Sequence, residues 1–334
     1  MDNEVLVEVT RGPIVENRIR GAVSVIDGNR LIACAGDPYY MTYMRSVAKP
    51  VQAAIVIEST AADHYGFTDK EIAVMCGSHI GDQDHCETVR GILEKIGLTE
   101  ENLDLYKDYS LSAELREQRI AAHEEPRLIY NNCSGKHACM LAVCRRFGWD
   151  FDKYYEISHP VQQMVLDLIA DFSEIKKEDI VIGLDGCGVP VFGMPLDKIA
   201  LCYLNLVRPA RMPSEAHREA AERITRAMAA YPEMLFGSGF FATELIRVTN
   251  GRIIGKIGAD GVFAFACEDQ PLAAAVKIED GSVPMVPIVV MEVLKQLDLL
   301  TEQETAELSS FSRYETINCH GIKAGETVPV FRLH

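Results

Sequence analysis

Arg45-Ser46-Val47-Ala48-Lys49-Pro50 is the stretch at which a β-rich beginning of the chain gives way to helices. Proline is tolerated in the first turn of a helix, so Pro50 and the Ala-, Val- and Ile-rich run after it predict a helix that begins near Arg45 or Ser46. A serine at a helix start and a lysine three residues later lie on one helix face. A desolvated lysine can take the proton of such a serine, which suits acyl transfer.

The same Ser-x-x-Lys spacing recurs at Ser173-Glu174-Ile175-Lys176, in a charged stretch that we interpret as surface. The pattern alone is therefore weak. The structural alternative for Ser46 and Lys49 is a helix-capping serine beside a solvated lysine. Other parts of the chain must support the catalytic interpretation.

The segments on either side of this stretch predict the fold class. Strands are predicted by alternation and turn signals, including a hairpin at Asn250-Gly251, over residues 5–9, 22–26, 30–35, 179–184, 244–248, 252–257, 262–267 and 273–278. Helices are predicted by their spacing over residues 69–76, 84–96, 136–147, 160–172, 214–230 and 286–299.

Both chain ends thus supply β-structure around a helical middle. We predict an α+β fold, with an antiparallel sheet made by the two ends, flanking helices and an inserted helical region. The expected organisation is a single catalytic unit over residues 1–334, β-rich at about 1–45 and 240–280 and mostly helical at about 46–235.

Composition excludes several classes of protein. The 334 residues carry a formal net charge of −16, and no basic stripe indicates nucleic-acid binding. No apolar run approaches the ~18 residues of a membrane span. The start Met1-Asp2-Asn3-Glu4 is acidic where a signal peptide needs positive charge, so we expect a cytoplasmic protein.

Two further motifs resemble those of serine acyl-transfer enzymes. Cys76-Gly77-Ser78-His79 places a second serine in a turn, and a predicted strand ends in Lys256-Ile257-Gly258-Ala259-Asp260-Gly261. Penicillin-recognising enzymes have the same order of a Ser-x-x-Lys helix, a serine turn and a strand with Lys-Thr-Gly. Taken singly, the serine turn is an ordinary capped turn and Lys256 an ordinary strand lysine.

Two cysteine-bearing turns offer ligands for a soft metal. They are Asn131-Asn132-Cys133-Ser134-Gly135-Lys136-His137 and Asp185-Gly186-Cys187-Gly188. Zinc needs three or four ligands and prefers thiolates, so ligand chemistry favours Cys133, Cys187 and His137. The alternative is that both cysteines are small buried side chains.

These five motifs, in this order, resemble the zinc-dependent, Rhizobium-type L-asparaginases over nearly the whole chain. The resemblance implies a fold similar to serine β-lactamases and to one class of glutaminases. It implies two Ser–Lys pairs, Ser46 with Lys49 and Ser78 with Lys256. It places the zinc on Cys133, Lys136 and Cys187, with Lys136 in place of His137, and implies a homodimer.

The function expected from this resemblance is hydrolysis of L-asparagine to L-aspartate and ammonia. Ser46 would attack the side-chain amide with Lys49 as general base, and Ser78 with Lys256 would relay the proton. Arg45 and Asp185 are candidates for binding the α-carboxylate and α-ammonium of the substrate, and His137 is a third candidate contact. The alternatives are a glutaminase or other amidase on the same scaffold and, outside enzymes, a zinc-thiolate binding or redox-sensing protein.

Overall fold

The computed structural model describes residues 3–334 and divides them into two compact units. The sheet unit comprises the chain up to Val47 together with Met194–Leu204 and Glu244–His334. The helical unit comprises Ala48–Gly193 and Asn205–Thr243. That both belong to one catalytic unit stays a prediction.

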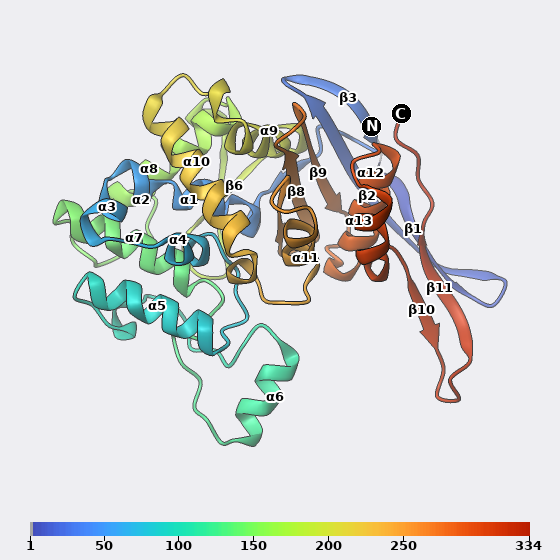
Figure 1. The fold of residues 1–334 in the computed structure, drawn as a ribbon, viewed down its shortest axis with the longest axis horizontal. Coiled ribbons are helices and arrows are strands. Elements are labelled where there is room, and N and C mark those ends of the chain that lie inside the picture. The colour runs from blue at the N-terminus through green and yellow to red at the C-terminus, as the bar shows by residue number, and fades with distance from the viewer. Residues whose placement is uncertain (1–2) are drawn as a thin grey trace. The chain divides into compact units, whose positions relative to one another are not determined.

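The sheet unit is built on one eight-stranded antiparallel sheet (Figure 1). Its main order is β10-β11-β1-β2-β9-β8-β7, and β3 pairs with β2. The strands are β1 (Glu4–Arg11), β2 (Ile14–Asp27), β3 (Arg30–Ala35), β7 (Ile253–Gly258), β8 (Val262–Cys267), β9 (Leu272–Ile278), β10 (Tyr314–Ile317) and β11 (Lys323–Pro329). The predicted antiparallel sheet from both chain ends is confirmed, because β2 pairs with β9 over seven residues.

The centre of this sheet is covered on both faces. Every residue of β8 and β9 is buried, which explains their nearly continuous apolar sequence. Helix α12 (Val286–Gln296) packs across β1, β8, β9 and β11, with α13 (Glu302–Glu307) after it (Figure 1). The short strand β4 (Met41–Tyr43) leads toward the Ser46 stretch.

The predicted strand 244–248 and its hairpin are wrong, because this segment is helix α11 (Phe241–Val248). Asn250 and Gly251 adopt positive φ angles of 49° and 77° and end the helix, and the Gly251 amide bonds to the Ile246 carbonyl. Asn-Gly occurs both in hairpin turns and at helix C-termini, so this dipeptide could not distinguish the two structures. The helix predicted over residues 286–299 is confirmed as α12 (Val286–Gln296), but it does not close the fold, because the strands β10 and β11 follow it.

The helical unit is organised around α7 (Ser134–Phe147). This helix is buried continuously from Ser134 to Cys144 and contacts α1, α2, α3, α4, α5 and α8. Surrounding elements are α1 (Lys49–Ala53), α2 (Ile55–Glu58), α3 (Ala61–Tyr65), α4 (Asp69–Met75), α5 (Gln83–Lys95), α6 (Ala113–Ala121), α8 (Pro160–Ser173), α10 (Glu215–Ala230) and the antiparallel pair β5 (Val181–Leu184) with β6 (Pro190–Pro195). Helix α9 (Leu196–Val207) carries the chain from one unit into the other.

The helix predicted near Arg45 is confirmed in position but is not continuous. It starts as a 3₁₀ turn over Arg45–Ala48 and continues as the short helices α1, α2 and α3. A membrane-spanning helix was not expected, and none of the helices in residues 3–334 has the length and apolar character to cross a membrane.

His217 ties three helices of this unit together and gives a pH-dependent prediction. Its Nδ1 bonds to Glu58 of α2 and its Nε2 lies 2.9 Å from the Asp171 carboxylate of α8. Glu58 first and Asp171 second raise the pKa of His217 above its ordinary value against the effect of burial. A raised folded-state pKa stabilises the fold fully below the unfolded value of about 6.5, and this stabilisation is lost as pH rises through the folded value.

We therefore expect His217→Asn to lower the free energy of unfolding by about 1 kcal/mol at pH 6 and by much less at pH 9. Urea unfolding of both proteins at the two pH values measures the difference. An equal loss at both pH values would show that His217 contributes only uncharged packing.

Candidate functional site

Lys49 is a buried lysine at the start of α1, with 1% of its surface exposed. Its Nζ lies 2.7 Å from the Gly77 carbonyl, 2.9 Å from Ser78 Oγ and 3.2 Å from the Asn132 carbonyl. Burial lowers the pKa of Lys49, as does the nearby Lys136, although neighbouring thiols partly oppose them. The structure thus brings Lys49 to Ser78, the second predicted serine.

The three contacts of Lys49 suit both of its protonation states. The two carbonyls can only accept hydrogen bonds, so two N–H groups are directed at Gly77 and Asn132. The third direction faces Ser78 Oγ, which can accept from an ammonium or donate to a neutral amine. Ser78 is therefore a neighbour with which Lys49 can exchange a proton.

Ser46 lies in the 3₁₀ turn of the sheet unit, half-buried and next to the end of β7. A Cβ added to Gly258 would lie 3.2 Å from the Met44 carbonyl and 3.3 Å from the Ser46 amide nitrogen. The glycine of the Lys-x-Gly motif therefore allows this close backbone approach. Lys256, two residues earlier, is fully buried, and its Nζ donates to the Ile257 carbonyl at 2.9 Å.

Arg45, immediately before Ser46, has a left-handed backbone with φ of 48°. Such a conformation costs energy in a non-glycine residue and is often retained at functional sites. Its guanidinium forms an ion pair with Asp260 in the turn after β7. A substrate carboxylate at Arg45 would therefore compete with Asp260.

The cysteine turns meet at the N-terminus of α7. Lys136 Nζ lies 2.9 Å from Cys187 Sγ, and the Cys133 thiol hydrogen-bonds to Cys187. This bond from Cys133, together with the Lys136 charge, lowers the pKa of Cys187 against the effect of burial. Burial lowers the pKa of Lys136, but Cys187, Cys133 and Asp185 raise it more. The predicted metal ligands are therefore in mutual contact.

The chemistry of this donor set fits zinc, because the Cys133 thiol and the Lys136 amine both contact Cys187, and Cys187 favours the thiolate that zinc prefers. Lys136 would have to lose its proton to join them. Within residues 3–334, no cluster of three or more His, Cys, Asp or Glu side chains is arranged to hold a metal. A site here depends on the lysine.

Asp185 and His137 lie around the same donor set. The Asp185 carboxylate is 3.9 Å from Lys136 Nζ and 3.7 Å from Cys187 Sγ. His137 is fully buried, and its Nδ1 lies 2.6 Å from the Tyr154 hydroxyl. Burial first and the Lys136 charge second lower the pKa of His137 to about 3. His137 is therefore a neutral ring held by Tyr154.

A cavity of about 630 Å³ opens beside Cys187. Its lining is largely apolar and aromatic and comes from three loops and the end of β5: Asp104, Leu105, Tyr106, Tyr155, Glu156, Ile157, Ser158, Leu184, Gly186, Cys187 and Gly188. It gives solvent and small molecules a path to the cysteine side of the site.

The units divide the predicted site residues. Arg45, Ser46 and Lys256 belong to the sheet unit; the helical unit holds Lys49, Ser78, Cys133, Lys136, His137, Asp185 and Cys187. Sequence reasoning missed the two carbonyls on Lys49, because a backbone acceptor leaves no residue-type signal. It also missed Tyr154, which lies in an irregular segment 17 residues after His137.

The Ser-x-x-Lys pattern at residues 173–176 does not form such a site. Ser173 is fully buried rather than on the surface, and its hydroxyl donates to the Ile169 carbonyl at 2.7 Å. Lys176 is exposed beyond the helix end. The hydroxyl thus serves the last turn of α8.

Comparison with known proteins places these motifs in a family. The family model described as L-asparaginase II matches residues 7–329. Among solved structures, a β-lactamase from Mycobacterium bovis is 18% identical with a TM-score of 0.42, over 83% of this chain and 94% of that one. A Bacillus glutaminase is 12% identical with a TM-score of 0.36, over 84% and 91%. The search of curated proteins finds no match.

Proposed function

Because the chain belongs to the L-asparaginase II family and is an L-asparaginase-type amidohydrolase, we propose that it hydrolyses L-asparagine by serine–lysine acyl transfer. The observation that carries this proposal is the buried Lys49, held by two carbonyls and by Ser78 Oγ at 2.9 Å. A buried amine of lowered pKa, directed at a hydroxyl, is the arrangement expected of a general base.

In the proposed reaction Ser46 Oγ attacks the side-chain amide carbon of asparagine. Lys49 takes the serine proton, and Ser78 and Lys256 pass a proton to the leaving ammonia. Water then hydrolyses the aspartyl ester and restores Ser46. Backbone N–H groups at the start of the helical turn stabilise the oxyanion, each by a few kcal/mol (roughly 3–4) where such donors are preorganised.

We propose that the substrate is bound by two charged side chains, Arg45 and Asp185, each of which already lies beside an oppositely charged residue. Arg45 binds the α-carboxylate in exchange for its ion pair with Asp260. Asp185 binds the α-ammonium, and its side chain is largely buried beside Lys136. This exchange of ion pairs would favour a free amino acid over an amide within a peptide, because both charged termini are required.

Cys133, Lys136 and Cys187 are the residues that we propose hold zinc. When bound, the metal would supply Lewis-acid polarisation or orientation of the substrate. The nucleophile and base are still supplied by the serines and lysines. A cytoplasmic location and a homodimer are further proposals. The homodimer rests on the resemblance to the family, and light scattering of the purified chain tests it.

The test of the proposed function is ammonia release from asparagine and from glutamine by the purified protein. We expect release from asparagine at a higher kcat/KM than from glutamine. A preference for glutamine would favour the glutaminase alternative. Release from neither amide, with thiol-linked behaviour instead, would favour a zinc-thiolate or redox-sensing protein.

Metal removal gives a separate prediction. Dialysis against a zinc chelator should lower ammonia release about 100-fold, since Lewis-acid or orienting effects supply several kcal/mol. Zn²⁺ and not Mg²⁺ should restore it, because the donors are soft. Cys187→Ser should release ammonia as slowly as the protein from which zinc has been removed. Elemental analysis of this variant should find less bound zinc. Unchanged activity in protein shown to lack zinc would contradict a role for the metal.

A further inference from the structure

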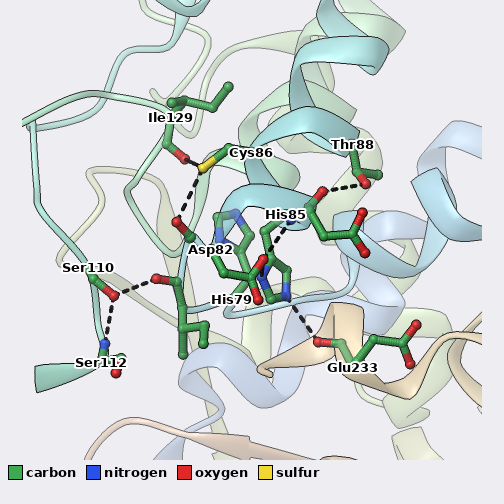
Figure 2. A network of polar contacts seen from close by, with 12 residues as sticks. His79, Asp82, His85, Cys86, Thr88, Ser110, Ser112, Ile129 and Glu233 are labelled. Carbon is green, nitrogen blue, oxygen red and sulfur yellow. Dashed lines mark hydrogen bonds and ion pairs between the residues drawn. The ribbon is translucent and has the colours of Figure 1, made fainter. Parts of the chain in front are cut away.

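Two buried histidines follow Ser78 and have no part in the reaction described above. His79 and His85 are at most 1% exposed, and their rings stack with centroids 5.0 Å apart and planes inclined by 17° (Figure 2). A histidine pair buried this completely needs partners for its ring nitrogens.

His85 is fixed on both sides and supports the ring of His79. Its Nε2 donates to the Glu233 carbonyl at 3.0 Å, since a carbonyl can only accept (Figure 2). Its Nδ1 lies 2.7 Å from the carboxylate of Asp82, which also caps α5. The ring is therefore a rigid surface against which His79 is held.

The protonation state of His79 follows from its partner. Nε2 lies 2.9 Å from Ser134 Oγ, and Ser134 Oγ donates its single proton to the Ile129 carbonyl at 3.1 Å. Ser134 Oγ must therefore accept from His79, so the proton sits on Nε2. Burial, and next the charges of His85 and Lys49, lower the pKa of His79 well below its ordinary value, so the ring is neutral.

This bond joins the same two turns that hold Lys49. One turn carries Gly77, Ser78 and His79, and the other carries Asn132 and Ser134. Lys49 contacts the first turn at Gly77 and Ser78 and the second at Asn132. The His79–Ser134 bond directly links the two turns.

Backbone packing leaves these turns little freedom to compensate. A Cβ added to Gly135 would lie 2.3 Å from the Val74 carbonyl, and one added to Gly77 would lie 2.4 Å from the Met234 carbonyl. The Ser78 amide also donates to the Leu235 carbonyl at 2.8 Å. Each turn is thus in direct backbone contact with its neighbours, and the His79–Ser134 bond adds a side-chain link between the two turns.

We propose that His79 is a positioning residue, whose Nε2–H bond to Ser134 Oγ fixes the spacing of Ser78 and Asn132 around Lys49. The inference rests on the proposed function, since Lys49 is the base whose position matters. Its physical reason is that a misplacement of about 1 Å in a catalytic constellation can lower the rate about 100-fold.

Two substitutions of the same residue separate positioning from packing. His79→Gln keeps an N–H near the position of Nε2, whereas His79→Asn is too short to reach Ser134. We expect His79→Asn and Ser134→Ala to lower kcat about 10- to 100-fold with KM changed less than about threefold. His79→Gln should keep most of kcat, and the double variant His79→Asn/Ser134→Ala should lose no more than either single one.

His217→Asn is the matched control, because His217 also has two polar partners in the helical unit but lies outside the proposed catalytic site. It should lower stability without lowering kcat. Equal kcat losses in His79→Gln and His79→Asn, accompanied by a loss of thermal stability like that of the control, would overturn the proposal. So would wild-type kcat in His79→Asn.

Amide hydrogen exchange followed by mass spectrometry tests the link without any activity. Peptides over residues 76–80 and 131–137 should exchange faster in His79→Asn than in His79→Gln, with other segments unchanged. If the wild-type protein released no ammonia, the proposed function would fail while this measurement still decided the link. Identical exchange in the two variants would overturn the positioning role.

Discussion

Ser46→Ala should abolish ammonia release from asparagine, with kcat lowered by a factor on the order of 10⁴ or more, because removal of a nucleophile leaves only binding and oxyanion stabilisation. The fold should be unaffected, since Ser46 is half-buried in a 3₁₀ turn and a methyl group fits there. Ammonia release and the thermal unfolding midpoint, measured on the same preparation, check both statements.

The control for this experiment is the repeated pattern in the chain itself. Ser173→Ala removes the serine of Ser173-Glu174-Ile175-Lys176, whose hydroxyl only bonds to carbonyls of its own helix. Its kcat should equal that of the wild type. Full activity in Ser46→Ala would exclude the proposed mechanism.

The contact between Lys49 and Ser78 makes Ser78 the rival nucleophile. Mass spectrometry of peptides from protein quenched during turnover would locate the acyl group. An acyl adduct on the peptide that contains Ser46 supports the proposed assignment. An adduct on the peptide that contains Ser78 would exchange the roles of the two serines.

The sheet could be predicted from sequence where local signals were strong. The strands predicted over residues 22–26 and 30–35 are confirmed as parts of β2 and β3, which pair across the turn at Gly28 and Asn29. Strands β10 and β11 were missed because their exposed residues and short length give little alternation. Strand β11 pairs with β1, more than 300 residues away in the chain, and β10 pairs with β11, so no local pattern records what stabilises them.

For the candidate site, the sequence predicts a set of residues but not the contacts among them. Spacing predicts Ser46 and Lys49 on one helical face, and this segment is a 3₁₀ turn over Arg45–Ala48 followed by short helices. The Lys49 amine also meets a turn 28 residues later in the chain, which spacing did not predict. Ligand chemistry favoured His137, and no local pattern records the contact of Lys136 with Cys187, which arises from the packing of two distant turns.

Lys49→Met should lower kcat by a factor on the order of 10³, within the upper range for loss of a general base. Methionine matches the length of the lysine stem but leaves Gly77 O, Asn132 O and Ser78 Oγ without their shared donor. Two buried carbonyls without partners also destabilise the fold, by roughly 1–3 kcal/mol each. Thermal unfolding must therefore be measured beside kcat.

A double-mutant cycle with Ser78→Ala distinguishes the catalytic loss from the structural one. If the exchangeable proton of Lys49 faces Ser78, the two substitutions interrupt one step, and the double variant should lose little more kcat than Lys49→Met alone. Additive losses would mean that Lys49 acts on Ser46 independently of Ser78. The stability changes should combine differently, because the carbonyls of Gly77 and Asn132 lose their donor only when Lys49 is replaced. Non-additivity confined to kcat would thus identify the Lys49–Ser78 contact as part of the proton path rather than only of the packing.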